Sequence, residues 1–201
     1  MEFLLLVTCV AVVAYTFKSR NEQRRIALLG SHLGKYQIEK LMETLTDGYL
    51  RALGEADPER RGFIWRQLEA SELKLCEQFT SFAAAFARVG EADARVSTLA
   101  VSFPYADKLF PRRTFDMRKA LAVHAQGILQ AVENKAGRTP KNKAFTLLAE
   151  LFLMQHTCHW FCKSRTVASA RVLVRHKTPY YQLLESVAPQ TRLAYAALVG
   201  K

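Results

Sequence analysis

Apolar side chains recur every three or four positions along most of this chain, which is the spacing of one face of an α-helix. Residues 35–53 carry one such stripe, with polar residues opposite, and Gly54 follows as a stop signal. Asp57 and Pro58 then form a helix start, an N-cap acid followed by proline at the first helical position. We expect this second helix to continue to Val89 and, at about 45 Å, to form the spine of a bundle.

The middle of the chain predicts shorter helices separated by an irregular interval. A helical stretch over 91–102 leads into residues 103–113, which two prolines interrupt. Thr114 is a candidate N-cap for the next helix, which stops near Gly137 and carries His124 on its apolar stripe.

The C-terminal third opens with another helix start at Thr139-Pro140, and this helix is predicted to continue to about Arg165. Its predicted buried face consists of Phe145, Leu148, Leu151, Phe152, Gln155, Cys158 and Cys162. Residues 167–177 fit a helix, although their valines also allow an extended segment from Arg171 onward. Pro179 and Pro189 open two short final helices. The sequence therefore predicts an all-α fold, with a bundle of about five to seven helices after the N-terminal segment.

The N-terminal segment differs from the rest because it is apolar all round. Residues 3–17 contain no charge, and Lys18, Arg20, Arg24 and Arg25 follow directly. A spanning helix usually needs about 20 apolar residues, so this run of fifteen is short. Flanking lysines and arginines that reach toward the headgroups, together with local bilayer thinning, can close the gap.

The order of charges around this run favours a retained membrane anchor over a cleaved signal peptide. A signal peptide has basic residues before its apolar core and a small-x-small cleavage site after it, whereas here Glu2 precedes the run and the basic residues follow it. A helix buried within a protein complex is the other alternative. By the positive-inside rule we expect the N-terminus outside and the body in the cytoplasm, with its thiols reduced. We divide the chain into an anchor with its basic flank (1–29) and a basic all-α domain (30–201).

Charge is the most informative bulk property. The 201 residues carry a formal net charge of +11, with 29 Lys/Arg against 18 Asp/Glu. Residues 41–100 are mildly acidic, while residues 101–201 hold sixteen Lys/Arg against five acids. This asymmetry indicates a polyanionic partner, which could be anionic lipid headgroups, an acidic protein or a nucleic acid. A solvated basic surface is the alternative interpretation.

Basic residues also gather at three predicted helix starts, where the helix dipole prefers acids. Free N–H groups beside Arg or Lys form sites for phosphate or carboxylate groups. We therefore predict anion binding at one or more of these clusters. The candidates are Arg112, Arg113, Arg118 and Lys119 at the first start, Arg138, Lys141 and Lys143 at the second, and Arg175 and Lys177 at the third.

A His/Cys cluster near residue 160 is the remaining candidate for chemistry. His156, Cys158, His159 and Cys162 lie three or four residues apart on a predicted helix, so pairs of metal ligands share a face. A metal or haem site is one interpretation. Residues of the hydrophobic core are the other, because no Cys-x-x-Cys pair occurs and cysteine is a common core residue. We predict no cofactor.

Function follows from these features only in outline. There is no glycine-rich phosphate loop, no nucleophile elbow and no His-Glu-x-x-His motif, so nothing supports an enzyme. We expect a membrane-anchored interaction or accessory protein whose basic face docks an acidic partner or anionic headgroups. A metal- or haem-binding domain and an electrostatic nucleic-acid binder are the alternatives, the latter without a recognisable binding motif.

Overall fold

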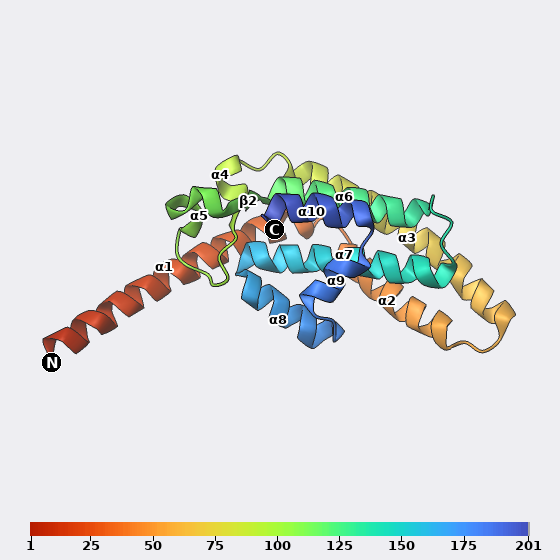
Figure 1. Cartoon of the computed structure of the whole chain (residues 1–201), viewed down its shortest axis with the longest axis horizontal. Coiled ribbons are helices and arrows are strands. Elements are labelled where there is room, and N and C mark those ends of the chain that lie inside the picture. Colours follow the sequence, from red (N-terminus) through yellow and green to blue (C-terminus); the bar gives the residue numbers. More distant parts are fainter. Residues whose placement is uncertain (201) are drawn as a thin grey trace.

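The computed structural model describes residues 1–200 and confirms an all-α fold (Figure 1). Setting aside the long helix α1 and the four-residue helices α4 and α5, seven helices form the body within these residues. The α-helices are α1 (Glu2–Leu33), α2 (Ile38–Gly54), α3 (Pro58–Phe86), α4 (Glu91–Ala94), α5 (Ala106–Leu109), α6 (Met117–Glu133), α7 (Pro140–Cys162), α8 (Arg165–His176), α9 (Tyr180–Ser186) and α10 (Pro189–Val199). A 3-10 turn (Pro111–Arg113) and the strands β1 (Arg95–Ser97) and β2 (Thr114–Asp116) complete the fold.

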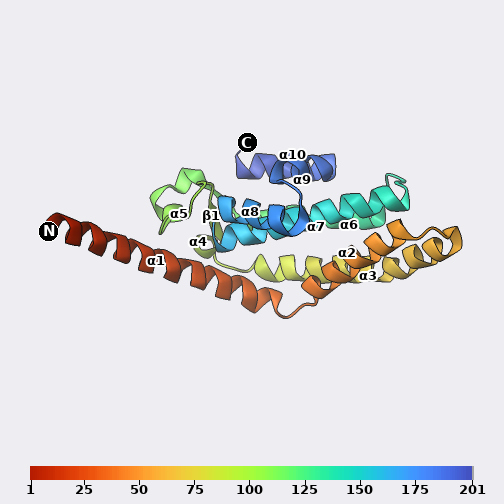
Figure 2. The ribbon, with the colours of Figure 1, turned by 90° about the horizontal axis from the view of Figure 1, so that it is seen from below.

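Helix α1 is continuous over 32 residues, and its two halves have different surroundings. The N-terminal half projects away from every other element, as both ribbon views show (Figures 1 and 2). Its most apolar 18-residue stretch is not buried at all, and the helix is long and apolar enough to cross a membrane. The C-terminal half packs on α3 and α7, and Leu29 is buried there. The predicted boundary between residues 29 and 30 therefore lies within α1.

Helices α2 and α3 form a hairpin along one side of the body (Figure 2). The Asp57 carboxylate accepts the backbone N–H of Glu59 at 2.8 Å, which confirms the predicted helix start. Helix α3 carries the aromatic residues Phe79, Phe82 and Phe86, whose successive ring centroids lie 5.7 and 6.0 Å apart. Aromatic pairs at such spacings stabilise a protein by more than the apolar area that they bury. This face of α3 is therefore a main part of the hydrophobic core.

Helix α7 lies at the centre of the body and contacts α1, α2, α6, α8 and α9. The prediction of a single buried face was wrong for this helix, since Leu147, Leu153 and Phe161 are buried on other sides and Phe145 is 52% exposed. A helix surrounded by neighbours is apolar all round, so its sequence contains no single stripe that identifies one core face.

Two short strands replace part of the predicted helical pattern. The helix expected over 91–102 ends at Ala94, and β1 pairs with β2 in antiparallel register, Val96 opposite Phe115. Thr114 therefore belongs to β2, and Asp116 is the N-cap of α6, accepting the Arg118 N–H at 2.9 Å. Both paired apolar residues are buried. Three-residue strands are too short for alternation to be recognised in a sequence.

The C-terminal helices follow the predicted order with one shifted boundary. Helix α7 ends at Cys162, and Ser164 caps α8 by accepting the Val167 N–H at 3.3 Å. The extended alternative for residues 171–177 was wrong, because they lie in α8 and its C-cap. Helices α9 and α10 begin at or beside the two predicted prolines.

Candidate membrane-proximal site

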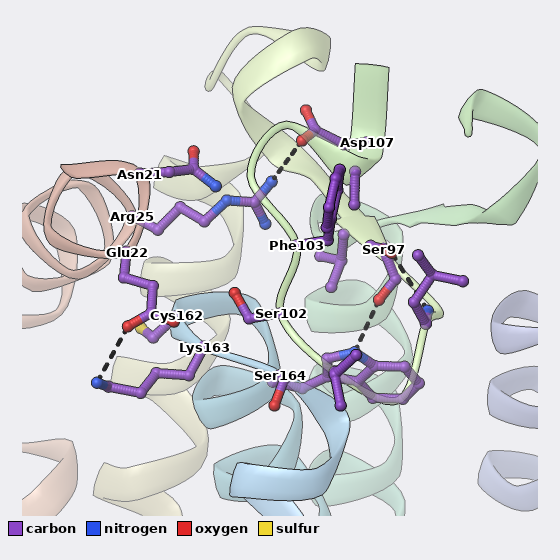
Figure 3. Close-up of a pocket in the computed structure, with 15 residues that line it drawn as sticks. Asn21, Glu22, Arg25, Ser97, Ser102, Phe103, Asp107, Cys162, Lys163 and Ser164 are labelled. Atoms are coloured by element: carbon purple, nitrogen blue, oxygen red, sulfur yellow. Dashed lines mark hydrogen bonds and ion pairs between the residues drawn. The ribbon is translucent and has the colours of Figure 1, made fainter. Parts of the chain in front are cut away.

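Four segments meet where α1 leaves the body, and their side chains enclose a small pocket (Figure 3). We call this pocket the anchor junction and define it by Glu22 and Arg25 of α1, Asp107 of α5, Cys162 of α7 and Lys163. Charged groups from α1 thus face charged groups from distant parts of the chain. The junction determines how the projecting half of α1 is attached to the body.

Arg25 is the central residue of the anchor junction. Its guanidinium lies 3.3 Å from the Asp107 carboxylate, and the two side chains are only 14% and 10% exposed. The same guanidinium donates to the Phe161 carbonyl at 3.3 Å and lies 5.4 Å from the centre of the Phe161 ring. Burial lowers the pKa of Arg25, and Asp107 opposes that shift. Arg25 therefore fastens α1 to the body instead of extending into solvent.

The other flank residues are placed differently. Glu22 accepts from Lys163 at 3.2 Å and lies 4.0 Å from Lys18, which adds a second tie between α1 and the end of α7. Arg24 forms an exposed pair with Asp93 at 2.7 Å. Arg20 is exposed and forms no ion pair with any residue from 1 to 200. The basic flank thus both attaches the helix and presents free positive charge.

The first predicted anion cluster is partly neutralised inside the protein. Arg118 forms a bidentate pair with Asp116, at 2.7 Å for the shortest contact. Partial burial raises the pKa of the Asp116 carboxyl, but its hydrogen bonds to Arg118 outweigh that effect and lower the pKa below its ordinary value. The start of α6 is therefore already capped by a carboxylate. Arg112, Arg113 and Lys119 are exposed.

The second cluster contributes one residue to the interior. Lys143 pairs with the buried Glu72 at 2.5 Å, and Glu72 also accepts from the Tyr49 hydroxyl at 2.5 Å. Lys141 is exposed and lies 6.0 Å from the centre of the Phe145 ring. Arg138 is half-buried, and its backbone N–H donates to the Asn134 side chain at 3.0 Å. Among residues 1–200, neither Lys141 nor Arg138 forms an ion pair, and Lys141 is the more exposed of the two.

The third cluster lies at a helix C-terminus, not at a helix start. Arg175 is in the last turn of α8 and Lys177 is its left-handed C-cap, with φ 54°. Thr178 does not cap α9, which begins at Tyr180 after Pro179. Cations at a C-terminal turn are favoured by the helix dipole, so the unfavourable charge arrangement inferred from the sequence does not exist here.

The three clusters are far apart in the fold (Figure 1). The first lies near α5 and the anchor junction, the second at the α6–α7 turn at the opposite end of the body, and the third at the end of α8. The nine predicted residues do not converge on one site. Only the first cluster lies at the same end of the molecule as α1.

The His/Cys cluster is divided among different neighbours. His156 is buried, pairs with the Ser169 hydroxyl at 3.0 Å and stacks on Tyr180, and burial lowers its pKa to about 3. Cys158 contacts Met154, His159 faces Arg171 at 3.2 Å, and Cys162 lines the anchor junction. His124 contacts, at 2.8 Å, the hydroxyl of Thr157, which lies between His156 and Cys158 in the sequence. Within residues 1–200, no three His, Cys, Asp or Glu side chains are arranged to hold a metal ion.

Sequence reasoning missed a shallow groove between α7 and α8. Val167 and Val174 line it with apolar surface, and Arg171 and Arg175 lie along it. Arg175 also borders a second groove, whose α2 wall carries Glu39, Glu43 and Asp47. The alternation of valine and arginine in the sequence of α8 could have indicated this groove, but the same pattern also fitted an extended segment.

Together these features are suited to attachment and docking. Helix α1 is fastened to the body by paired charges, and the apolar groove lies between α7 and α8 on the surface of the body. The comparisons with known proteins add no relationship: no family model, no curated protein and no solved structure matches this chain.

Proposed function

We propose that this protein is a single-pass, membrane-anchored interaction or accessory protein, with its N-terminus outside and its helical body on the cytoplasmic side. The observation that carries the proposal is the division of α1. No part of its most apolar 18-residue stretch is buried, while its polar half is fastened to the body by Arg25–Asp107 and Glu22–Lys163. A continuous helix of this kind holds a folded domain at a set distance from the bilayer.

The orientation is supported by the charges beside the apolar run. Lys18, Arg20 and Arg24 follow residues 3–17 within one to two helical turns, whereas Glu2 is the charged side chain on the other side. Basic residues near the end of a span favour the cytoplasmic side. The exposed Arg20 would also meet anionic headgroups, whose potential decays within about 8 Å of the surface at physiological salt.

For the docked partner we propose an acidic amphipathic helix, held in the α7–α8 groove. Val174 is 71% exposed and Val167 lines the same groove two helical turns earlier, so apolar residues of a partner helix would be buried there. Arg171 and Arg175 would face acidic residues at the edge of that helix. Helix-in-groove binding of this kind combines apolar anchors with a charged rim.

A photo-crosslinking residue at position 174 of the full-length protein tests this proposal. Position 193 on α10 is a matched control, since Leu193 is 70% exposed, almost the same as Val174. We expect position 174, but not 193, to cross-link in native membranes to an acidic helical segment, identified by mass spectrometry. Arg171→Glu should reduce the yield roughly tenfold, equivalent to about 1.4 kcal/mol, while Lys141→Glu should not. Equal products from both positions, or a captured segment without acidic residues, would contradict it.

A further inference from the structure

Residues 99–113 contain five exposed large apolar or aromatic side chains. Val101 is 66% and Leu109 59% exposed, and Phe103, Tyr105 and Phe110 are also exposed. These residues surround the short helix α5 and the turn that follows it. Apolar residues scattered singly on a surface need no explanation, but a cluster indicates a binding surface. We call residues 99–113 the anchor-side segment.

The anchor-side segment lies beside the point where α1 leaves the body (Figure 1). The ring of Tyr105 is 6.2 Å from that of Phe17, the last residue of the uncharged run. Asp107 in the same segment pairs with Arg25, two helical turns further along α1. If residues 3–17 lie in a bilayer, the segment is therefore held at the level of the membrane surface.

The length of the apolar run supports the same placement. Fifteen residues at 1.5 Å per residue extend about 22 Å, whereas the hydrocarbon core is about 30 Å thick. A short span is accommodated when the bilayer thins or the flanking protein sinks into the interface. Apolar side chains next to Phe17 would make that sinking favourable, because they leave water on entering the headgroup region.

The segment also carries cations suited to an anionic leaflet. Lys108, Arg112 and Arg113 are exposed, and none of them forms an ion pair with residues 1–200. Lys108 lies 5.3 Å from the centre of the Tyr105 ring. Basic residues interleaved with aromatic and aliphatic ones are typical of protein surfaces that lie in the membrane interface.

Contacts with the body hold the segment in this position. The Ala100 carbonyl accepts from both the backbone N–H and the hydroxyl of Thr166, at 3.2 and 2.6 Å. The Thr98 N–H donates to the Arg113 carbonyl at 2.8 Å, which closes the segment at its base. Both ends are therefore fixed. Between them, Val101 and Phe103 line the anchor junction, while Leu109 and Phe110 are exposed.

We infer that the anchor-side segment is a second membrane contact, which inserts its apolar side chains into the interface of an anionic leaflet next to the anchor. The inference rests on the proposed membrane anchoring by α1. With this second contact the body is attached to the bilayer both by α1 and by the anchor-side segment. It is therefore held in one orientation and does not rotate freely about α1.

Lipid quenching of tryptophan fluorescence tests the inference with the full-length protein in vesicles of phosphatidylcholine and phosphatidylserine. Tryptophan is introduced by Phe110→Trp, Leu109→Trp, Val10→Trp or Leu173→Trp, the last on exposed α8 as a control. The signal of the unmodified protein, which comes from Trp65 and Trp160, is subtracted from that of each variant. Lipids brominated near the headgroup end of the acyl chains should quench tryptophan at 109 and 110 several times more than at 173. Lys108→Glu/Arg112→Glu/Arg113→Glu should reduce that quenching, and Lys141→Glu should not.

The outcomes separate this inference from the proposed function. Quenching at position 10 without quenching at 109 and 110 overturns the inference and leaves the anchor in place. Absence of quenching at position 10 overturns membrane anchoring itself. A soluble quencher gives a third outcome. If positions 109 and 110 are protected from it in native membranes, but not in vesicles that contain this protein alone, a protein partner covers them and the inference is overturned. Unchanged circular dichroism of each variant shows that the fold is intact.

Discussion

Replacing Arg25 with alanine is expected to lower the free energy of unfolding of the body by about 3–5 kcal/mol, the usual cost of removing one partner from a buried ion pair. The substitution leaves the Asp107 carboxylate, only 10% exposed, without its guanidinium. It also removes the hydrogen bond to the Phe161 carbonyl and the contact with the Phe161 ring. Urea unfolding in mild detergent, followed by the fluorescence of Trp65 and Trp160, measures the change.

Arg20→Ala is the matched control for Arg25→Ala. Both arginines belong to the basic flank of α1, but Arg20 is exposed and lacks an ion pair in the described chain, so its removal should change stability by less than about 0.5 kcal/mol. The double variant Arg25→Leu/Asp107→Leu should recover part of the loss, because no charge remains buried. Equal effects of Arg25→Ala and Arg20→Ala would show that Arg25 faces solvent or lipid in the folded protein.

Glu150→Gln is expected to stabilise the protein by about 2–3 kcal/mol at pH 8 and to have almost no effect near pH 4.5. Glu150 is completely buried, and burial raises the pKa of its carboxyl to about 7, although the Ala188 N–H donates to it at 2.9 Å. Because this pKa lies above the value in the unfolded chain, the folded state favours the protonated acid. Its contribution is present at low pH and is lost as pH rises from about 4.5 through 7. Glutamine has no charge to bury.

Two buried histidines give the free energy of unfolding the opposite pH dependence, in the Glu150→Gln variant and in the unmodified protein alike. Burial lowers the pKa of His124 and of His156 to about 3, so their contribution is present above pH 6.5 and is lost as pH falls toward 3. The difference between Glu150→Gln and the unmodified protein cancels this effect and isolates Glu150. Urea unfolding at several pH values gives the comparison, with the exposed Glu185→Gln as control. A difference that stays constant from pH 4.5 to 8 would show that Glu150 is not buried as a neutral acid.

The parts of the fold that the sequence predicted correctly depend on neighbouring residues. Asp57-Pro58 and Thr139-Pro140 begin helices because capping and proline geometry act within one turn. Residues 3–17 have no charge, so their apolar character needs no partner to be recognised.

The parts that could not be predicted depend on distant contacts. Arg25 and Asp107 are separated by 82 positions, and nothing local distinguishes Arg25 from Arg20. The pairing of β1 with β2 likewise joins segments about twenty residues apart, and it moved the cap of α6 from Thr114 to Asp116. Burial on several sides of α7 is set by the five helices around it, not by its own periodicity.

Protease treatment of intact cells that express the full-length chain with a C-terminal tag tests the central claim most directly. We predict that the tag survives protease added outside, is destroyed once the membrane is opened, and belongs to a product that still contains residues 1–17 by mass spectrometry. Destruction of the tag from outside, or a mature product that lacks those residues, would contradict the account.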